Sequence, residues 1–283
     1  MSELAKSQNS IQARPVQVHP LAVVDSKAQL DQGVVIGAGT VVGPDVEIGE
    51  NTIVGPNVVL DGKLKIGSFN KIFPGACLGL EPQDLKYKGA PTEVLIGDKN
   101  TIRECVTVNR ATNEGEVTRI GNGSLLMAYT HIAHGCHIGN KVIISNSVQV
   151  AGEVVIEDQA VIGGSLGIHQ FVHIGTLAMV GGMTRVDRDV PPYCLAEGHP
   201  GRLRGLNRVG IRRQGLESQK PQEFRQLLDI WNLIFRSGHV FSEGIQLARE
   251  SNLMPAAQKL CFFLEASIEK GRRGPMPFIT SKI

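Results

Sequence analysis

The repeat that sets the fold is clearest in the stretch Leu-Leu-Met-Ala-Tyr-Thr-His-Ile-Ala-His-Gly-Cys-His-Ile-Gly-Asn at residues 125–140. Leu126, Ile132 and Ile138 recur at every sixth position, with histidines between them. Continued in both directions, this register covers 29 positions from Val18 to Val186, and 26 of them are Val, Leu or Ile. A helix would repeat near 3.6 residues, so a period of six indicates a repeat architecture.

Each hexad is typical of a short strand followed by a corner. The residue two positions before the aliphatic is small or β-branched, as at Val34, Thr40 and Val46, and glycine often follows the aliphatic, as at Gly37 and Gly43. Glycine accepts the positive φ that a sharp corner can require. Three hexads would close one triangular coil, and about ten coils would stack at the strand spacing of ~4.8 Å. The sequence therefore predicts a mainly β protein, built as a parallel β-helix.

Two polar stretches interrupt the register. Residues 81–93 are either an inert connection or a functional loop on a rigid scaffold. Residues 109–118 are also polar, and we predict that they form an inert connection.

The repeat ends where Pro191 and Pro192 follow each other, because proline cannot continue a strand ladder. We therefore expect three parts: a flexible tail at 1–15, a β-helix at 16–193 and a helical domain at 194–283.

Apolar residues in the last part follow a helical period. Further helical stretches cover about 241–250 and 255–270. The first stripe is interpreted as core between helices, and not as a binding surface. It consists of Phe224, Leu227, Leu228, Trp231, Ile234 and Phe235.

Composition argues against several classes of protein. Lys and Arg number 29 against 27 acidic residues, which is not the charge excess of a nucleic-acid-binding protein. The five cysteines form no C-x-x-C pair, which favours reduced thiols. No apolar run reaches the ~18 residues of a membrane span, and residues 1–14 are too polar for a signal peptide. We expect no membrane segment and a cytoplasmic location.

The histidines are the candidate chemical groups. The inward positions of a hexad are the aliphatic and the residue two before it, and His131, His134, His137, His169 and His173 occupy neither. All five are predicted to point outward. We expect His137 and His173, which are separated by two full coils and so share one column, to be plain surface side chains.

His134 is the candidate general base. An imidazole ionises near neutral pH and can take a proton from a hydroxyl held beside it. Steps of one coil, or three hexads, lead from His134 to Gly152 and then to Gln170. Gly152 would offer an unobstructed backbone N–H to a developing oxyanion, and Gln170, beside His169, would orient substrate. A base, an N–H donor and a polar side chain in one column suit acyl transfer without a nucleophilic protein residue.

Zinc binding is the alternative role for this histidine cluster, as in the trimeric carbonic anhydrases built on the same type of β-helix. Zinc–nitrogen bonds of ~2.0–2.1 Å require ligands that converge on one point. Hexad spacing spreads these histidines over different faces and coils, and no acidic or thiol partner has metal-motif spacing. We expect no metal.

The repeat resembles that of the hexapeptide-repeat transferases, whose fold is a left-handed parallel β-helix. The handedness follows from this resemblance alone, because the usual crossover preference is right-handed. From about residue 16 to the C-terminal helices, the chain is also similar to the UDP-N-acetylglucosamine O-acyltransferases of lipid A synthesis. Six signatures carry that resemblance: Gln83-Asp84-Leu85-Lys86-Tyr87, Ile102-Arg103-Glu104, His131-Ile132-Ala133-His134, His169-Gln170-Phe171, Met179-Val180-Gly181-Gly182 and Asp189-Val190-Pro191-Pro192-Tyr193.

The resemblance implies transfer of a 3-hydroxyacyl chain from acyl carrier protein to the 3-hydroxyl of UDP-N-acetylglucosamine. The site would lie between subunits of a homotrimer, and no metal or bound organic cofactor would take part. His134 matches the base and Gly152 the oxyanion donor. Gly182 matches the end of the acyl-chain groove. The expected substrate-binding residues are Asp84, Lys86, His131, Glu153, His169, Gln170, Gly182, Asn207 and Arg213.

Several positions depart from the family pattern. Glu153 stands where well-known members have a histidine near the acyl acceptor, and Gly135 replaces an aspartate after the base. Asn109 replaces another cleft histidine, while Val209 and Gln214 replace a glutamate and an arginine of the nucleotide site. Some members prefer a 3-amino sugar analogue, so the identity of the sugar stays open, as does the length of the acyl chain.

Two other functions compete with this one. The related N-acyltransferases normally carry an N-terminal uridine-binding domain, whereas only the short tail at 1–15 precedes the repeat here. A non-catalytic scaffold would dock partners on the prism faces and would not need His134.

A cluster of arginines follows the repeat. We predict that Arg213 meets the nucleotide diphosphate and that the others steer the acidic carrier protein, the alternative being a solvated loop. The cluster consists of Arg202, Arg204, Arg208, Arg212 and Arg213.

Overall fold

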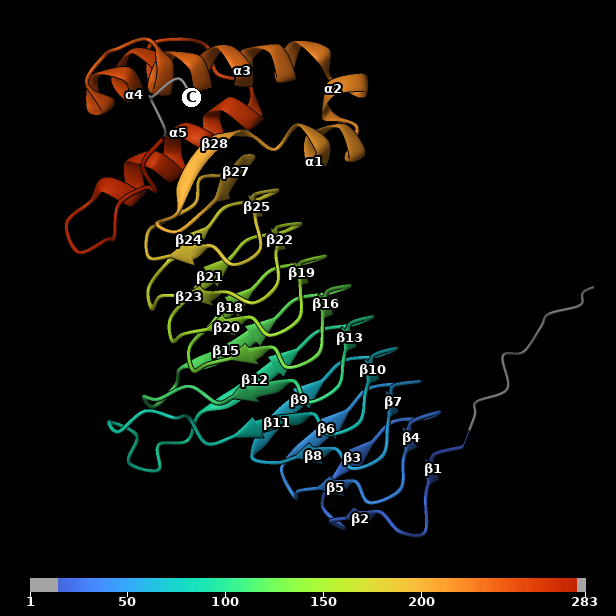
Figure 1. Cartoon of the computed structure of the whole chain (residues 1–283). Coiled ribbons are helices and arrows are strands. Elements are labelled where there is room, and N and C mark those ends of the chain that lie inside the picture. Colours follow the sequence, from blue (N-terminus) through green and yellow to red (C-terminus); the bar gives the residue numbers. More distant parts are fainter. Residues whose placement is uncertain (1–14, 279–283) are drawn as a thin grey trace, which may run out of the picture.

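The computed structural model describes residues 15–278, most of which form a three-sided prism of short strands (Figure 1). Each side is one sheet, and consecutive strands of the chain enter the three sheets in turn. Of the predicted tail at 1–15, residues 1–14 lie outside the described range.

Sheet A has eleven strands and runs the full length of the prism. Its strands are β1 (Gln17–Val18), β4 (Val35–Ile36), β7 (Ile53–Val54), β10 (Lys71–Ile72), β13 (Thr101–Ile102), β16 (Leu125–Leu126), β19 (Ile143–Ile144), β22 (Val161–Ile162), β25 (Met179–Val180), β27 (Cys194–Glu197) and β28 (Arg202–Leu206).

Sheet B has nine strands. They are β2 (Val23–Val24), β5 (Val41–Val42), β8 (Val59–Leu60), β11 (Cys77–Leu80), β14 (Thr107–Asn109), β17 (His131–Ile132), β20 (Gln149–Val150), β23 (Gly167–Ile168) and β26 (Arg185–Val186).

Sheet C has eight strands. They are β3 (Gln29–Leu30), β6 (Val46–Ile48), β9 (Lys63–Ile66), β12 (Glu93–Ile96), β15 (Val117–Ile120), β18 (His137–Ile138), β21 (Val155–Ile156) and β24 (His173–Ile174).

The register of the sheets confirms the coil of three hexads. Leu125 pairs with Ile143, and Ile143 pairs with Val161, in parallel ladders. The hexad aliphatics fill the interior, and Leu126 and Ile132 are fully buried. Some inward positions, two residues before the aliphatic residue, carry polar side chains. These side chains form hydrogen bonds to backbone groups of neighbouring coils, so their burial leaves no polar atom unpaired there. These residues are Thr40, Thr52, Asn70, Asn100 and Ser124.

Both polar stretches are insertions between coils. Cys77 pairs with Thr107 across a coil longer than three hexads, because residues 81–92 leave the side of the prism as a loop (Figure 1). Thr107 pairs with His131 across another lengthened coil, because residues 110–116 form a second, shorter loop. Below we call residues 81–92 the first loop.

The end of the prism is a hairpin. After Pro191 and Pro192, strand β27 still pairs in parallel with β25, and β28 then returns antiparallel to β27. The predicted division at residue 193 thus falls inside a region that continues sheet A. Proline ends the hexad register but does not end the sheet.

Among the described residues, five helices follow this hairpin, and they cover this end of the prism (Figure 1). The predicted apolar stripe lies on α3, with Trp231 2% exposed, so its interpretation as core is confirmed. The helical stretches predicted at 241–250 and 255–270 are also confirmed. The helices are α1 (Arg208–Arg213), α2 (Leu216–Gln219), α3 (Pro221–Arg236), α4 (Phe241–Arg249) and α5 (Pro255–Ile268). Within residues 15–278, none of the helices has the length and apolar character needed to span a membrane.

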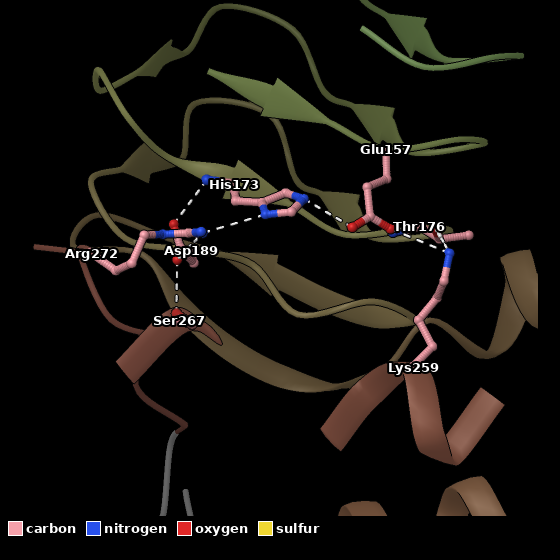
Figure 2. Close-up of polar contacts among 7 residues, drawn as sticks. All are labelled: Glu157, His173, Thr176, Asp189, Lys259, Ser267 and Arg272. Atoms are coloured by element: carbon pink, nitrogen blue, oxygen red, sulfur yellow. Dashed lines mark hydrogen bonds and ion pairs between the residues drawn. The ribbon is translucent and has the colours of Figure 1, made fainter. Parts of the chain in front are cut away.

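A buried carboxylate ties the helices to the prism (Figure 2). Asp189 is fully buried and accepts hydrogen bonds from the backbone N–H of His173 at 2.8 Å, from Ser267 Oγ at 2.8 Å and from Arg272 Nη2 at 3.0 Å. A buried charge is tolerated only when it is paired and hydrogen-bonded, and Asp189 is both.

A second set of polar contacts lies beside the first (Figure 2). The Glu157 carboxylate lies 2.8 Å from His173 Nε2 and accepts a hydrogen bond from Thr176 Oγ1 at 2.5 Å. Lys259 of α5 donates to Thr176 Oγ1 at 2.8 Å and lies 3.5 Å from Glu157. Burial alone would raise the pKa of Glu157, but the bonds from His173 and Thr176 outweigh it and lower that pKa to about 2.

Candidate active site

His134 lies at the corner that leads from sheet B to sheet C, two residues after β17, and is half-buried. Its Nε2 atom is 3.8 Å from Asp84 Oδ2, and its Nδ1 atom is 3.6 Å from Glu153 Oε1. Both distances exceed a hydrogen bond. The ring thus lies between two carboxylates, with one on the side of each nitrogen.

Gly152 lies against the ring of His134. A Cβ atom at position 152 would overlap the imidazole, so only glycine leaves room for it. The column predicted by stepping one coil at a time is present here: the backbone N–H of Glu153 donates to the His134 carbonyl, and that of Phe171 donates to the Gly152 carbonyl. Gln170, the third member, is exposed.

Gly135 and Glu153 fit each other in the same way. Gly135 has a φ of 65°, and a Cβ there would overlap the Glu153 carboxylate. The two departures from the family pattern are therefore coupled in space. Position 135 carries no carboxylate, and the next coil supplies one instead, on the Nδ1 side of His134.

Asp84 reaches His134 from the first loop. Its Oδ1 atom accepts the backbone N–H of Lys86 at 3.0 Å, and its Oδ2 atom accepts a hydrogen bond from Thr112 Oγ1 at 3.1 Å. The bond from the Lys86 N–H is the largest cause of the lowered pKa of Asp84, followed, among the causes that lower it, by the Thr112 bond. The carboxylate is thus held ionised. Lys86 itself is exposed.

His131 is fixed from the coil below. Its Nδ1 atom lies 2.7 Å from Thr107 Oγ1. Burial lowers the pKa of His131, and the neighbouring His134 lowers it further, which favours a neutral imidazole. His131 and His169 line one groove of about 400 Å³ along sheet B, together with Gln149 and Arg185.

The remaining predicted residues lie elsewhere on the chain. Gly182 is exposed in the turn between β25 and β26, and Arg213 is exposed in the last turn of α1. Asn207 caps α1: its Oδ1 accepts the Gly210 N–H at 3.0 Å and its Nδ2 donates to the Leu177 carbonyl at 2.9 Å. The contacts of the described residues join none of these three to His134.

Of the two histidines predicted to be plain surface side chains, His137 is exposed, whereas the prediction is wrong for His173. His137 is exposed on sheet C, in the same column as His173. His173 is half-buried, ion-paired to Glu157 and packed on Phe263 of α5 with ring centroids 4.7 Å apart. The reason is the docking of α5 onto this coil, which a repeat register does not report.

Within the part of the chain that the structure describes, no three His, Cys, Asp or Glu side chains are grouped as metal ligands would be.

Sequence reasoning missed Thr107 and Thr112. Thr107 meets His131, and Thr112 meets Asp84, across coils that insertions have lengthened, so a step of three hexads passes over both. The polar composition of residues 109–118 was the available signal for Thr112, although the same stretch was predicted to be an inert connection.

Two family models match the chain. The model described as UDP-N-acetylglucosamine O-acyltransferase, domain 2, matches residues 189–276. The model of bacterial transferase hexapeptide repeats matches residues 27–62 and 118–152.

Relatives with a stated activity match most of the chain. An acyl-[acyl-carrier-protein]–UDP-N-acetylglucosamine O-acyltransferase of Synechocystis is 51% identical over 220 residues, which cover 77% of this chain and 79% of the relative. A protein of the same name from Verminephrobacter eiseniae is 43% identical over 241 residues, covering 85% and 90%.

Solved structures match the fold over almost its whole length. The UDP-N-acetylglucosamine acyltransferase of Francisella novicida has a TM-score of 0.87 and 32% identity, covering 93% of this chain and 95% of its own. The LpxA structure from Acinetobacter baumannii has a TM-score of 0.84 and 38% identity, covering 92% and 99%. The expected left-handed parallel β-helix with C-terminal helices is confirmed.

Proposed function

The chain belongs to the family of acyl-[acyl-carrier-protein]–UDP-N-acetylglucosamine O-acyltransferases of lipid A biosynthesis, and we propose that His134 is the general base of its acyl transfer. The observation that carries this proposal is the position of the His134 ring, which lies against the backbone of Gly152 and between the carboxylates of Asp84 and Glu153.

The proposed reaction is a direct attack on a thioester. His134 takes the proton of the sugar 3-hydroxyl while the oxygen forms a bond to the thioester carbonyl carbon. The carbonyl oxygen becomes an oxyanion, which the backbone N–H of Gly152 stabilises. The C–S bond then breaks, and the proton held by His134 passes to the departing thiolate of the carrier protein. Neither a nucleophilic residue nor a metal is needed, because the thioester carbonyl is already electrophilic. Addition of a chelator to the assay should leave the rate unchanged.

Asp84 and Glu153 have different roles in this scheme. Both stabilise the transient imidazolium of His134 electrostatically. The Asp84 side chain is 20% exposed and Lys86 is exposed, so Asp84 is available to accept hydrogen bonds from sugar hydroxyls and Lys86 to bind the phosphates. His131 is held in place by Thr107, and burial and the neighbouring His134 lower its pKa and so keep it neutral. With His169 it lines the groove along sheet B, where both are proposed to receive the substrate, with Gln170 next to His169 in the sequence.

The active unit is proposed to be a homotrimer. Gly182, Asn207 and Arg213 lie on parts of the chain that share no contact with His134 within residues 15–278, although the family places all of them in one cleft. A three-fold interface brings different faces of the prism together, whereas one subunit cannot. Sedimentation should show a trimer, and a fully active monomer would contradict this part of the proposal.

Acyl carrier protein is the proposed donor partner, and UDP-N-acetylglucosamine the proposed acceptor. We place the reaction in the cytoplasm, which the five cysteines without a C-x-x-C pair support. The decisive assay supplies the purified enzyme with 3-hydroxyacyl carrier proteins of several chain lengths and with UDP-N-acetylglucosamine or its 3-amino analogue. Mass spectrometry should detect an ester of UDP-N-acetylglucosamine. Exclusive formation of an amide would make the chain an N-acyltransferase, and the absence of turnover would favour a scaffold.

A further inference from the structure

Residues 109–112, at the start of the second polar stretch, bind the first loop through side chains. Asn109 Nδ2 donates to the Glu81 carbonyl at 2.6 Å. Arg110 Nη1 donates to the Gly79 carbonyl at 2.8 Å. These bonds hold the point where the first loop leaves β11, so the path of the loop is fixed at its base.

Arg110 also holds the far side of the loop. Its Nη2 atom donates to Tyr87 Oη at 3.2 Å, and Tyr87 Oη donates to the Ala90 carbonyl at 3.3 Å. Only 12% of the Arg110 side chain is exposed. A Cβ at Gly62, which lies just after β8 on the coil below β11, would overlap the guanidinium, so a glycine at position 62 leaves room for it.

Thr112 acts on the carboxylate itself. Its hydroxyl donates to Asp84 Oδ2, the oxygen that lies nearest His134 Nε2, while Asp84 Oδ1 is held by the backbone N–H of Lys86. With both oxygens bonded, the carboxylate has one orientation. Thr112 is 5% exposed and Asn109 6%, which is unusual for polar residues of an inert connection.

We propose that residues 109–112 are a positioning element for the reaction. Thr112 orients the Asp84 carboxylate toward His134 and the substrate, and Arg110 keeps the first loop in the place where Asp84 can do so. None of the four residues needs to touch substrate for this role. The inference rests on the proposed function, because it gives Thr112 an effect on turnover only through Asp84.

The hydroxyl of Thr112 can be removed without a change of shape. Thr112→Val keeps the β-branched side chain but cannot donate, whereas Thr112→Ser keeps the donor. Loss of a hydrogen bond to a charged group costs enough free energy to lower a rate about tenfold or more. We expect kcat/KM to fall about tenfold in Thr112→Val and to stay within about twofold of wild type in Thr112→Ser. A wild-type kcat/KM in Thr112→Val would overturn the inference. So would a kcat/KM in Thr112→Ser as low as that in Thr112→Val.

A double-mutant cycle then tests whether Thr112 acts through Asp84. Asp84→Ala alone should lower kcat/KM. Adding Thr112→Val to Asp84→Ala should change it by less than about twofold, because no carboxylate is left to orient. An equal fold-loss in both backgrounds would mean that Thr112 acts by another route and would overturn the inference.

Hydrogen exchange separates this inference from the proposed function. The Lys86 amide donates to Asp84 Oδ1, so a carboxylate that loses its orientation should protect that amide less. We expect faster exchange across residues 81–92 in Thr112→Val and in Tyr87→Phe, and wild-type exchange in Thr112→Ser. Wild-type exchange in Thr112→Val and Tyr87→Phe would overturn the positioning role. If exchange is faster in Thr112→Val and Tyr87→Phe but Asp84→Ala keeps full activity, the role proposed for Asp84 is contradicted. The effect of Thr112 on turnover is then contradicted as well.

Discussion

The imidazole ring of His134 occupies the space that a side chain at position 152 would fill. The two residues are one full coil apart in the sequence, so the β-helix itself places the ring of His134 against the residue whose backbone N–H we assign to the oxyanion. A glycine is needed here for space, since its φ is not in the left-handed region.

Gly152→Ala should therefore displace the ring of His134. We expect kcat to fall by ~10²-fold or more, the size of the loss that follows misplacement of a catalytic group. The melting temperature should change little, because the half-buried ring can swing into solvent. Steady-state kinetics with scanning calorimetry checks this. Activity near wild type would show that the ring does not need its present position.

Gly182→Met should shorten the preferred acyl chain. Gly182 is exposed, and a Cβ there would meet only the carbonyl oxygen and nitrogen of Gly164, at 3.3 and 3.7 Å, so a side chain fits with a small shift. Each buried methylene contributes ~0.8 kcal/mol, close to fourfold in binding, so a blocked groove end changes preference by several carbons.

Competition between acyl carriers of different length measures this preference. Met183→Ala is the comparison, because Met183 is 77% exposed beside Gly182 and is the other side chain able to enter the groove. An unchanged ranking of acyl donors in Gly182→Met would place the end of the groove elsewhere.

Reversing charge at Arg202 and Arg204 should raise the KM for acyl carrier protein. Both residues lie on β28, and Arg204 is ion-paired to Glu197 at 3.1 Å. Steering of an acidic partner weakens with salt, since the Debye length is ~8 Å at 0.15 M. The double variant to Glu should therefore also lose most of the salt dependence of KM.

Lys27→Glu with Lys65→Glu is the matched control for this charge change. Lys27 lies just before β3 and Lys65 lies on β9, several coils before β28, and Lys65 is again ion-paired, to Glu47 at 3.0 Å. The control should bind the carrier normally. Equal behaviour of the two double variants would mean that the arginines form only a solvated loop.

Glu157 should stabilise the docked helices at neutral pH and cease to do so in acid. Its pKa is lowered from 4.5 to about 2, so the folded state binds this proton less readily than the unfolded state does. The contribution is complete above about pH 4.5 and is lost as the pH falls toward 2. We expect Glu157→Gln to be less stable than wild type by about 1 kcal/mol at pH 7, a size that allows for partial solvent screening.

Denaturant unfolding at several pH values measures the difference in free energy of unfolding between wild type and Glu157→Gln. This difference should shrink steadily below pH 4.5 and vanish near pH 2. Glu47→Gln, which removes an exposed partner of Lys65, should match wild type throughout. A difference for Glu157→Gln that is the same at pH 7 and pH 2.5 would show that its charge has no part in the docking.

The hexad register was sufficient to predict the prism and one side of the site. It placed His134 on Gly152 and put His137 and His173 in one column, because a coil without insertions has a fixed length. It also identified the outward positions correctly, since the inward ones are occupied by the aliphatics.

The register could not predict contacts made by insertions or by a docked domain. Asp84 and Thr112 meet although they are far apart in the sequence, because each belongs to a different loop between coils. His173 is covered by α5, whose contacts depend on tertiary packing. The strand after Pro192 was missed because β27 pairs with β25 outside the hexad register.

The central claim is that His134 removes the proton of the acceptor hydroxyl, and the most direct test is the turnover of His134→Ala. His137→Ala is the control, because His137 is an exposed histidine three residues after His134 and we assign it no role. Both variants should keep the melting temperature and the sedimentation of wild type. We predict that His134→Ala loses ~10²–10⁴-fold or more in kcat with saturating acyl carrier and acceptor, while His137→Ala keeps wild-type kcat. More than a tenth of wild-type kcat in His134→Ala would contradict the claim.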